Sequence, residues 1–288
     1  MKVQIEVTNV CNLKCKMCPR NDFHKLEIKH MPFGLFKRVV SRLSPSYKLV
    51  LTGWGEPFCH PKIYEMIKFC KKRGNEVSLT TNGLLLKPEK VIESGLDKIT
   101  FSIDSLGEGR MGHEISAAAK IKEFVEFKRR AKAKKPKITL QTVLIKKEDV
   151  IAVAHFAKEL GIHKLNLTKL DERIGTVRNM RDEELKSLIK ILNKIKIRFD
   201  LVQYAVGPRG VRLAYKIIRP ILLKGRCLRT YNYAYINVSG EVTPCCNLPR
   251  FRLGSILKDD LKKLLKGKDY KIFLRNSYKL CKGCNVFR

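Results

Sequence analysis

The sequence predicts an α/β domain with a parallel sheet, followed by a smaller C-terminal domain. Strand-like and helix-like stretches alternate from Val3 to about Asp200, the links between them are short, and the composition changes after residue 200. This alternation is typical of parallel sheets, in which sites gather at the carboxyl ends of the strands. We therefore expect one domain over residues 1–200 and a second over residues 201–288.

Short β-branched or apolar runs indicate the strands, and amphipathic spacing indicates the helices. The expected strands are Val3–Val7, Lys48–Leu51, Glu76–Thr80, Lys98–Ile103, Lys137–Leu144, Lys164–Leu167 and Ile197–Tyr204. The expected helices include Phe33–Leu43, Lys62–Lys72, Ile121–Lys134, Asp149–Leu160 and Asp182–Lys194.

The composition favours a soluble, cytoplasmic protein. Of the 288 residues, 44% are hydrophobic, and no apolar run approaches the length of a membrane span. The N-terminus has no signal-peptide pattern. Ten cysteines without a secretory signal point to a reducing compartment, where thiols more often bind metals or act in catalysis than form disulfides.

The net charge of +33, from 60 Lys and Arg against 27 Asp and Glu, predicts an anionic partner. Such a field attracts polyanions, of which nucleic acid is the commonest. Two segments are especially basic: Lys120–Lys137, expected to be a helix, and Arg209–Arg229. The alternatives are a solvated helix face and the lysine-rich surface of a thermophile, although thermophile surfaces usually gain Glu as well.

Three cysteines, Cys11, Cys15 and Cys18, follow the first expected strand with the spacing CxxxCxxC. Three thiolates are one short of the four that complete an iron-sulfur cluster, so one iron would keep an open position for chemistry. The alternatives are buried thiols or a zinc knuckle, for which His24 is the nearest further ligand.

Polar turns follow the next three strands in a fixed order. Thr52–Pro57 contains two glycines and a glutamate, Thr81–Gly83 is an Asn-Gly turn, and Ser102 and Asp104 end the fourth strand. Gln141 lies in the fifth strand. Each signal alone is weak, because glycine-rich turns are common in loops.

Taken together, the cysteine loop and these turns resemble the radical S-adenosylmethionine (SAM) family. The resemblance implies a partial (β/α)6 barrel and a [4Fe-4S] cluster on Cys11, Cys15 and Cys18 whose open iron binds SAM. It implies one-electron reduction by a donor such as ferredoxin or flavodoxin, cleavage of SAM to a 5′-deoxyadenosyl radical, and hydrogen abstraction from a substrate. The implied SAM contacts are Gly53, Trp54, Gly55, Glu56, Asn82, Ser102, Asp104 and Gln141. Met17 and Trp54 depart from the residues usual in the family at these places.

The C-terminal part contains half of the cysteines: Cys227, Cys245, Cys246, Cys281 and Cys284. From Leu201 to Arg288 there are 19 Lys and Arg against 4 Asp and Glu. Tyr231–Val238 and Glu241–Cys245 are expected to form a hairpin about Ser239-Gly240, and Asp259–Leu265 a short helix. Four of the thiolates are enough to complete a second cluster.

This arrangement resembles the shortened SPASM or "twitch" extension of radical SAM enzymes. The resemblance implies one auxiliary [4Fe-4S] cluster on Cys227, Cys245, Cys281 and Cys284, with Cys246 as the alternative to Cys245. Cys59 and Cys70 are expected to lie in the core or near the cluster.

Three functions remain open on the sequence. The first is radical SAM modification of RNA, tRNA above all, which the charge favours. The second is the same chemistry on a peptide, or dehydrogenation of a small anionic metabolite. The third is a non-catalytic, zinc-stabilised nucleic-acid-binding protein. No general acid or base is indicated by spacing, no membrane association is expected, and a monomer is the default oligomeric state.

Overall fold

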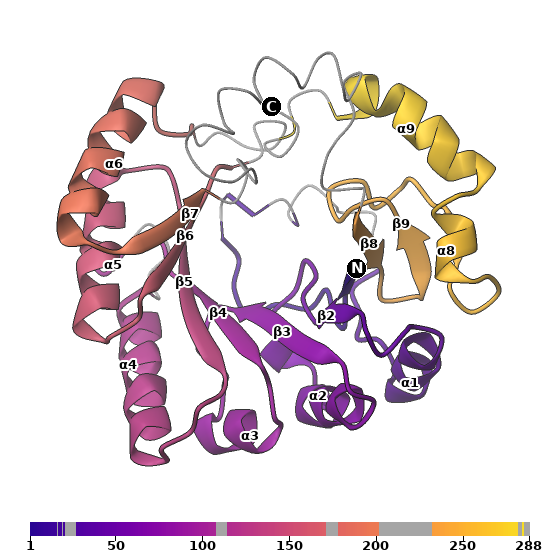
Figure 1. Ribbon diagram of the computed structural model, residues 1–288, viewed down its shortest axis with the longest axis horizontal. Helices are drawn as coiled ribbons and strands as arrows, with labels where there is room; N and C mark the ends of the chain where they lie inside the picture. Colours follow the sequence, from indigo (N-terminus) through magenta and orange to yellow (C-terminus); the bar gives the residue numbers. More distant parts are fainter. Residues whose placement is uncertain are drawn as a thin grey trace.

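The structure is a computed structural model that describes residues 1–15, 17–18, 20, 27–107, 114–170, 178–201, 232–281 and 284. The described strands form one 10-stranded sheet in the order β10-β9-β8-β1-β2-β3-β4-β5-β6-β7. As Figure 1 shows, the sheet is curved, and the helices lie on its outer side. The predicted α/β class with a partial parallel barrel is therefore confirmed.

The expected strands of the first domain are present, with ends shifted by a few residues. They are β1 (Lys2–Ile5), β2 (Lys48–Val50), β3 (Glu76–Thr81), β4 (Lys98–Ser102), β5 (Lys137–Val143), β6 (Lys164–Thr168) and β7 (Arg198–Leu201). Each pairs in parallel with the next. Consequently, the carboxyl ends of β1 to β7 lie at one edge of the sheet.

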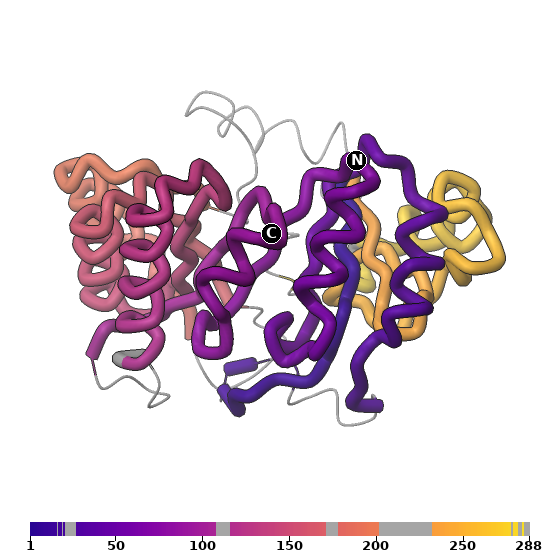
Figure 2. The backbone as a smooth tube through the Cα atoms, turned by 90° about the horizontal axis from the view of Figure 1, so that it is seen from below, coloured from indigo at the N-terminus to yellow at the C-terminus, as the bar shows by residue number. Residues whose placement is uncertain are grey.

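Helices cover the outer face of this sheet, as Figures 1 and 2 show. They are α1 (Phe33–Ser41), α2 (Ile63–Lys72), α3 (Pro88–Glu93), α4 (Glu114–Arg130), α5 (Lys147–Glu159) and α6 (Asp182–Ile195), and the 3-10 helix η2 (Pro57–Cys59) precedes α2. Helix α3 was not expected, because six residues are too few to show an apolar period. Residues 114–170 otherwise follow the expected alternation.

The expectation of one basic helix over Lys120–Lys137 is wrong. Helix α4 ends at Arg130, and Lys137 begins β5. Lys132 adopts a left-handed conformation with φ of 49°, and the Ala133 N–H donates to the Lys128 carbonyl at 3.1 Å. These are the contacts of a helix C-terminal cap, so the helix stops inside the run of cations.

The C-terminal elements continue the same sheet. Strand β8 (Tyr233–Ile236) pairs in parallel with β1, on the side opposite β2. Strands β9 (Glu241–Thr243) and β10 (Gly254–Ser255) follow in antiparallel pairing. The predicted hairpin is confirmed, and Gly240 adopts the positive φ of 81° at its turn. The expected short helix is α8 (Leu261–Leu264), and a further helix, α9 (Lys268–Leu280), precedes Cys281.

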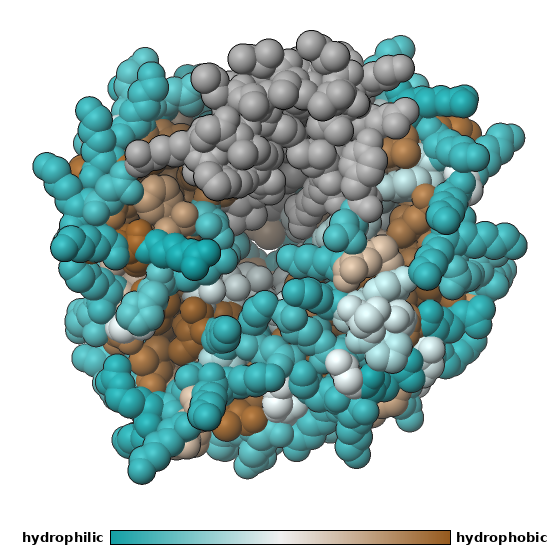
Figure 3. Space-filling model, viewed as in Figure 1, coloured by the Kyte–Doolittle hydropathy of each residue, from teal (hydrophilic) through white to brown (hydrophobic). Residues whose placement is uncertain are grey.

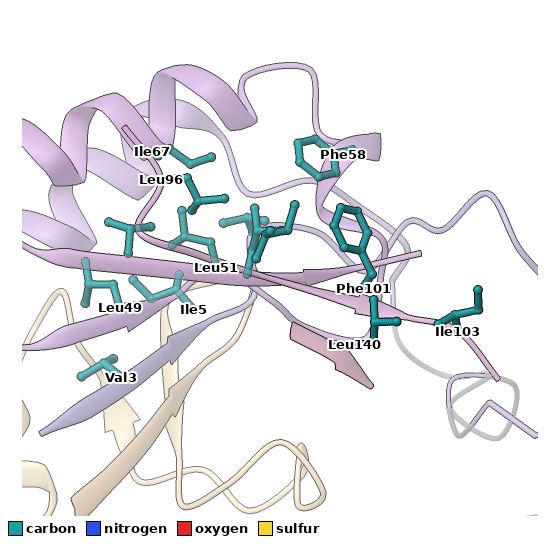
Figure 4. Packing of buried hydrophobic residues seen from close by; sticks show 14 of the residues in the cluster. Val3, Ile5, Leu49, Leu51, Phe58, Ile67, Leu96, Phe101, Ile103 and Leu140 are labelled. Atoms are coloured by element: carbon teal, nitrogen blue, oxygen red, sulfur yellow. The ribbon is translucent and has the colours of Figure 1, made fainter. Parts of the chain in front are cut away.

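The two faces of the sheet differ in chemistry. Val3, Ile5, Leu49, Phe101 and Leu140 belong to one hydrophobic core between the sheet and the outer helices (Figure 4). Because side chains alternate along a strand, the residues between them point to the inner face. That face carries hydroxyl, amide and carboxylate groups, and the parallel register aligns four such residues across neighbouring strands: Ser102, Gln141, Asn166 and Asp200.

The Asp97 carboxylate forms hydrogen bonds to several elements of the outer layer. Asp97 Oδ2 accepts from Lys71 Nζ of α2 at 2.5 Å and from the Val77 N–H of β3 at 2.8 Å. Its Oδ1 accepts from Lys135 Nζ, before β5, at 2.5 Å. The side chain is 9% exposed, so these charge-assisted hydrogen bonds are poorly screened.

We predict that Asp97→Asn lowers the free energy of unfolding by about 2 kcal/mol at neutral pH, because two ammonium groups lose their ionised acceptor. Burial alone would raise the pKa of Asp97, but the hydrogen bonds from Lys135, Lys71 and Val77 lower it below the ordinary 3.8. The contribution is therefore fully present above pH 3.8 and is lost as the pH falls below it. Urea unfolding of both proteins across this range should show the difference shrinking in acid.

Asp259→Asn is the control for this substitution. Its carboxylate is 40% exposed and reaches Lys263 at 4.0 Å, so we expect an effect near zero. Equal destabilisation by the two variants would contradict the assignment.

Candidate iron-sulfur and SAM site

The loop with the three cysteines leaves β1 at the carboxyl edge of the sheet and is fixed at both ends. After the loop, residues 29–31 return alongside residues 7–9: the Met31 N–H donates to the Val7 carbonyl, and Lys29 N–H to Asn9 Oδ1 at 2.7 Å. Inside the loop, Arg20 Nη2 donates to the Leu13 carbonyl at 2.8 Å. The loop is therefore shaped by the protein's own hydrogen bonds.

Cys11, Cys15 and Cys18 are half-buried and lie near one another. The Cys18 N–H donates to the Cys15 carbonyl at 2.9 Å. Burial, and then the neighbouring thiols of Cys18 and Cys11, raise the pKa of Cys15 to about 11. Burial also raises the pKa of Cys11. Cys11 and Cys15 therefore ionise readily only if a cation joins them.

A [4Fe-4S] cluster and a single metal ion place different demands on the three cysteines. Within the described parts of the chain, no three His, Cys, Asp or Glu side chains converge as ligands of one metal ion. In a [4Fe-4S] cluster each cysteine binds a different iron, so its thiolates need not converge. His24, the alternative zinc ligand, lies outside the described residues.

The glycine turn after β2 packs directly against the start of the cysteine loop. The Glu56 N–H donates to the Val10 carbonyl at 2.9 Å. A Cβ at Gly55 would lie 2.3 Å from the same carbonyl oxygen, and a Cβ at Gly53 would lie 2.2 Å from Glu6 Cγ. Both glycines are therefore required by close approach rather than by an unusual φ.

The Glu56 carboxylate is buried and serves the protein itself. It accepts from the Phe58 N–H at 3.1 Å, Thr81 Oγ1 at 2.7 Å and the Asn82 N–H at 2.8 Å. Burial raises its pKa, and these hydrogen bonds offset only part of the effect. Glu56 thus joins the turn after β2 to the turn after β3.

The remaining SAM-contact candidates lie in or after β3, β4 and β5, and two of them, Asn82 and Asp104, are linked to the cysteine loop. Asn82 Nδ2 donates to Asn12 Oδ1, next to Cys11, at 3.0 Å. Ser102 and Gln141 are paired in the β4–β5 register. Asp104 Oδ1 accepts from the Val143 N–H at 2.9 Å, and its charge contributes to the raised pKa of Cys15. The fold therefore brings residues from four strand ends to one place.

The C-terminal cysteines form a second group. Cys281 and Cys284 follow α9 and are buried, and the Cys284 N–H donates to the Cys281 carbonyl at 2.9 Å. Asn247 Nδ2 contacts Cys284 Sγ at 3.7 Å, which places the residues just after Cys245 beside this pair. Cys246 Sγ contacts Asn247 Oδ1 at 3.2 Å. Cys227 lies outside the described residues.

Cys59 and Cys70 have different surroundings. Cys70 is buried within α2, and burial raises its pKa to about 12, so it is a core residue. Cys59 is half-buried, and its Sγ contacts Asn12 Oδ1 at 3.9 Å, beside the cysteine loop.

Sequence reasoning missed several residues that shape the site: Gln4, Glu6, Asn12, Tyr233 and Tyr235. Gln4 and Glu6 are polar residues that alternate with Val3, Ile5 and Val7 in β1, so the period of two in principle marks them as facing inward. Their buried state depends on β8 lying beside β1, which nothing in the local sequence indicates.

Two family models match parts of the chain. Residues 5–160 match the Radical SAM superfamily, and residues 227–285 match SPASM, an iron-sulfur cluster-binding domain. The chain belongs to the radical SAM superfamily. A [4Fe-4S] cluster, an auxiliary cluster and SAM are accordingly its cofactors. Membership in this superfamily also favours a catalytic function over the alternative of a non-catalytic, zinc-stabilised nucleic-acid-binding protein.

Several proteins are similar in sequence to parts of this chain. The tungsten-containing aldehyde ferredoxin oxidoreductase cofactor-modifying protein of Pyrococcus furiosus is 30% identical over 180 residues, which are 58% of this chain and half of that protein. The GTP 3′,8-cyclase of Aquifex aeolicus is 29% identical over 226 residues, 74% of this chain and 69% of the relative. The probable GTP 3′,8-cyclase of Sulfurisphaera tokodaii is 31% identical over 231 residues, 76% and 72% of the two chains.

Solved structures share the fold at low identity. SuiB of Streptococcus suis, bound to the precursor peptide SuiA, superposes with a TM-score of 0.71 at 16% identity, covering 99% of this chain and 70% of SuiB. The enzyme anSMEcpe with bound AdoMet gives a TM-score of 0.71 at 18% identity, covering 99% and 83%. At these identities the likeness shows the fold alone. Among the described helices of this radical SAM protein, none is long and apolar enough to cross a membrane.

We predict that Gly55→Ala displaces the cysteine loop and prevents assembly of the first cluster, because the new Cβ would meet backbone atoms of Asn9 and Val10. The iron content, measured together with sulfide after anaerobic reconstitution, should fall from about eight irons per chain to about four. Gly34→Ala, in α1, is the control, since nothing lies within 4 Å of its Cβ position. Full iron content in Gly55→Ala would show that the close approach is not required.

Proposed function

We propose that this radical SAM enzyme modifies RNA. When bound, the cluster and SAM together supply one-electron cleavage of SAM and a 5′-deoxyadenosyl radical that abstracts hydrogen. Cys11, Cys15 and Cys18 would hold the cluster. Gly53 to Glu56, Asn82, Ser102, Asp104 and Gln141 would surround SAM. The observation that carries the RNA proposal is the net charge of +33, together with a cationic groove on the described surface.

The groove lies between α1, α2 and the turn after β10. It has a volume of about 500 Å³ and is lined by Lys37, Arg38, Ser41, Arg42, Phe69 and Leu257. Within the described residues, Lys37, Arg38 and Arg42 have no carboxylate partner, and Lys37 Nζ lies 5.2 Å from the Phe33 ring centre. Unpaired cations beside aromatic rings suit a phosphate backbone. Hydrophilic side chains also predominate over the described face in Figure 3.

The side chains on the inner face of the sheet suit a nucleoside as the substrate at the reaction centre. Asn166 and Asp200 continue the register row that begins with Ser102 and Gln141. Amide and carboxylate groups are the side chains that recognise base edges and ribose hydroxyls. We therefore propose Asn166 and Asp200 as substrate-positioning residues, on the side of the row away from β1.

A free nucleoside triphosphate is the second candidate substrate. The relatives from Aquifex aeolicus and Sulfurisphaera tokodaii are named GTP 3′,8-cyclases, and the same inner face would accept a single nucleotide. A peptide has weaker support, because the likeness to SuiB concerns the fold.

A SAM cleavage assay separates these substrates. Reconstituted enzyme with a strong reductant should form 5′-deoxyadenosine, and the Cys11→Ala, Cys15→Ala, Cys18→Ala variant should form none. Unmodified tRNA should increase this rate and accumulate a new nucleoside, detected by mass spectrometry of digested RNA. Stimulation by GTP instead of tRNA would establish the second candidate, and stimulation by neither would remove both.

We predict that charge reversal of the groove weakens tRNA binding. Lys37→Glu, Arg38→Glu, Arg42→Glu should reduce affinity at least about tenfold and lower the slope of log affinity against log salt by roughly 2, because phosphate contacts are lost. Filter binding over a salt series measures both quantities.

A second triple variant controls for net charge. Lys158→Glu, Lys186→Glu, Lys194→Glu removes the same charge from exposed positions on α5 and α6. It should keep most of the affinity. Equal losses in both variants would mean that overall charge, and not the groove, binds RNA.

A further inference from the structure

The turn after β2 is joined to the C-terminal hairpin by side chains that cross β1. Gln4 Nε2 donates to the Thr52 carbonyl at 2.8 Å, while Gln4 Oε1 accepts from the Tyr233 hydroxyl of β8. Gln4 therefore links the strand end that carries the glycine turn to a strand of the C-terminal region.

Glu6 makes the same connection one step further along β1. Its Oε1 accepts from the Trp54 N–H at 3.0 Å, and its Oε2 accepts from the Val238 N–H, in the β8–β9 turn, at 3.4 Å. Glu6 is 4% exposed, so both oxygens depend on these protein donors. A Cβ at Gly53 would overlap its side chain, so the turn and Glu6 are in direct contact.

Trp54 extends the connection to the second group of cysteines. Its Nε1–H donates to the Cys246 carbonyl at 3.2 Å, and Cys246 follows the predicted cluster ligand Cys245. Trp54 is thus held by its backbone N–H at Glu6 and by its indole N–H at Cys246. The indole is large and rigid, with two side-chain dihedral angles, so displacement of the turn would displace the Cys245–Cys246 segment.

We infer that Trp54 is a positioning residue that couples the SAM site to the auxiliary cluster. Binding of SAM at Gly53 to Glu56 would change the environment of the cluster held by Cys245, Cys281 and Cys284. This inference rests on the proposed placement of SAM and of the auxiliary cluster. The physical basis is that hydrogen bonds around the ligands of an iron-sulfur cluster tune its reduction potential.

The test is a redox titration of the reconstituted enzyme, followed by electron paramagnetic resonance, with and without SAM. In wild type, SAM should shift the midpoint potential of the auxiliary cluster. Trp54→Phe keeps an aromatic ring but removes the donor to Cys246, so the SAM-induced shift should fall to less than half. An unchanged shift in Trp54→Phe would overturn the inference.

Tyr64→Phe is the matched control. Tyr64 also makes one hydrogen bond through its ring substituent, accepting from the Lys87 N–H at 3.0 Å, but it lies in α2 on the outer layer. It should retain the full wild-type shift. Loss of the shift in Tyr64→Phe as well would show that any aromatic hydrogen bond affects the cluster, which also overturns the role of Trp54.

The single tryptophan provides a second measurement that needs no variant at position 54. Emission from Trp54 should be quenched when the auxiliary cluster assembles in the Cys11→Ala, Cys15→Ala, Cys18→Ala background, and should change on SAM addition in wild type. Absence of either change would overturn the inference. Failure of wild type to bind SAM, or to hold about eight irons, would instead contradict the proposed sites themselves.

Discussion

The buried carboxylate of Glu6 is the constraint on which the centre of the molecule depends. A carboxylate out of contact with water must keep hydrogen-bond donors, and these come from Trp54 and Val238, residues far apart in the chain. Burial raises the pKa of Glu6 more than the hydrogen bonds from the Trp54 and Val238 N–H groups lower it. The glycine turn, β1 and the C-terminal hairpin are therefore held as one unit.

The pairing of β8 with β1 explains why this carboxylate is buried. In an open parallel sheet β1 would be an edge strand, and Gln4 and Glu6 would face water. Instead β8 covers that edge in parallel register, with Tyr235 opposite Gln4. Tyr235 is fully buried beside Glu6, and burial and then the Glu6 charge keep its pKa well above 10.0. The C-terminal region thus completes the site formed by the first domain.

The cysteine loop combines hydrogen bonds within the protein with thiols that suit a bound cluster. The side chains of Arg20 and Asn9 hydrogen-bond to backbone groups of Leu13 and Lys29, at the described parts of the loop. The thiols themselves are partly buried, which raises the pKa of Cys11 and Cys15. Thiols that resist ionisation favour a cluster that supplies positive charge, and disfavour free thiolates.

The sequence alone determined the fold class and the order of the strand-end motifs, whereas its choice of the cysteines that hold the two clusters stays a prediction. These depend on local spacing: a period of two in strands, cysteines three or four residues apart, glycines in turns. The prediction of one helix over Lys120–Lys137 was wrong, because the sequence does not show where a helix cap interrupts a charged run. The domain boundary at residue 200 and the individual SAM contacts stay predictions.

The tertiary structure decided what the buried polar residues do. Glu56 forms three hydrogen bonds within the protein, and Trp54 reaches Cys246 across 192 positions of sequence. Long-range contacts of this kind leave no periodic signal in either segment. They follow from β8 lying beside β1, a pairing set by the packing of the whole chain, and so the link between the two groups of cysteines appears only in the folded protein.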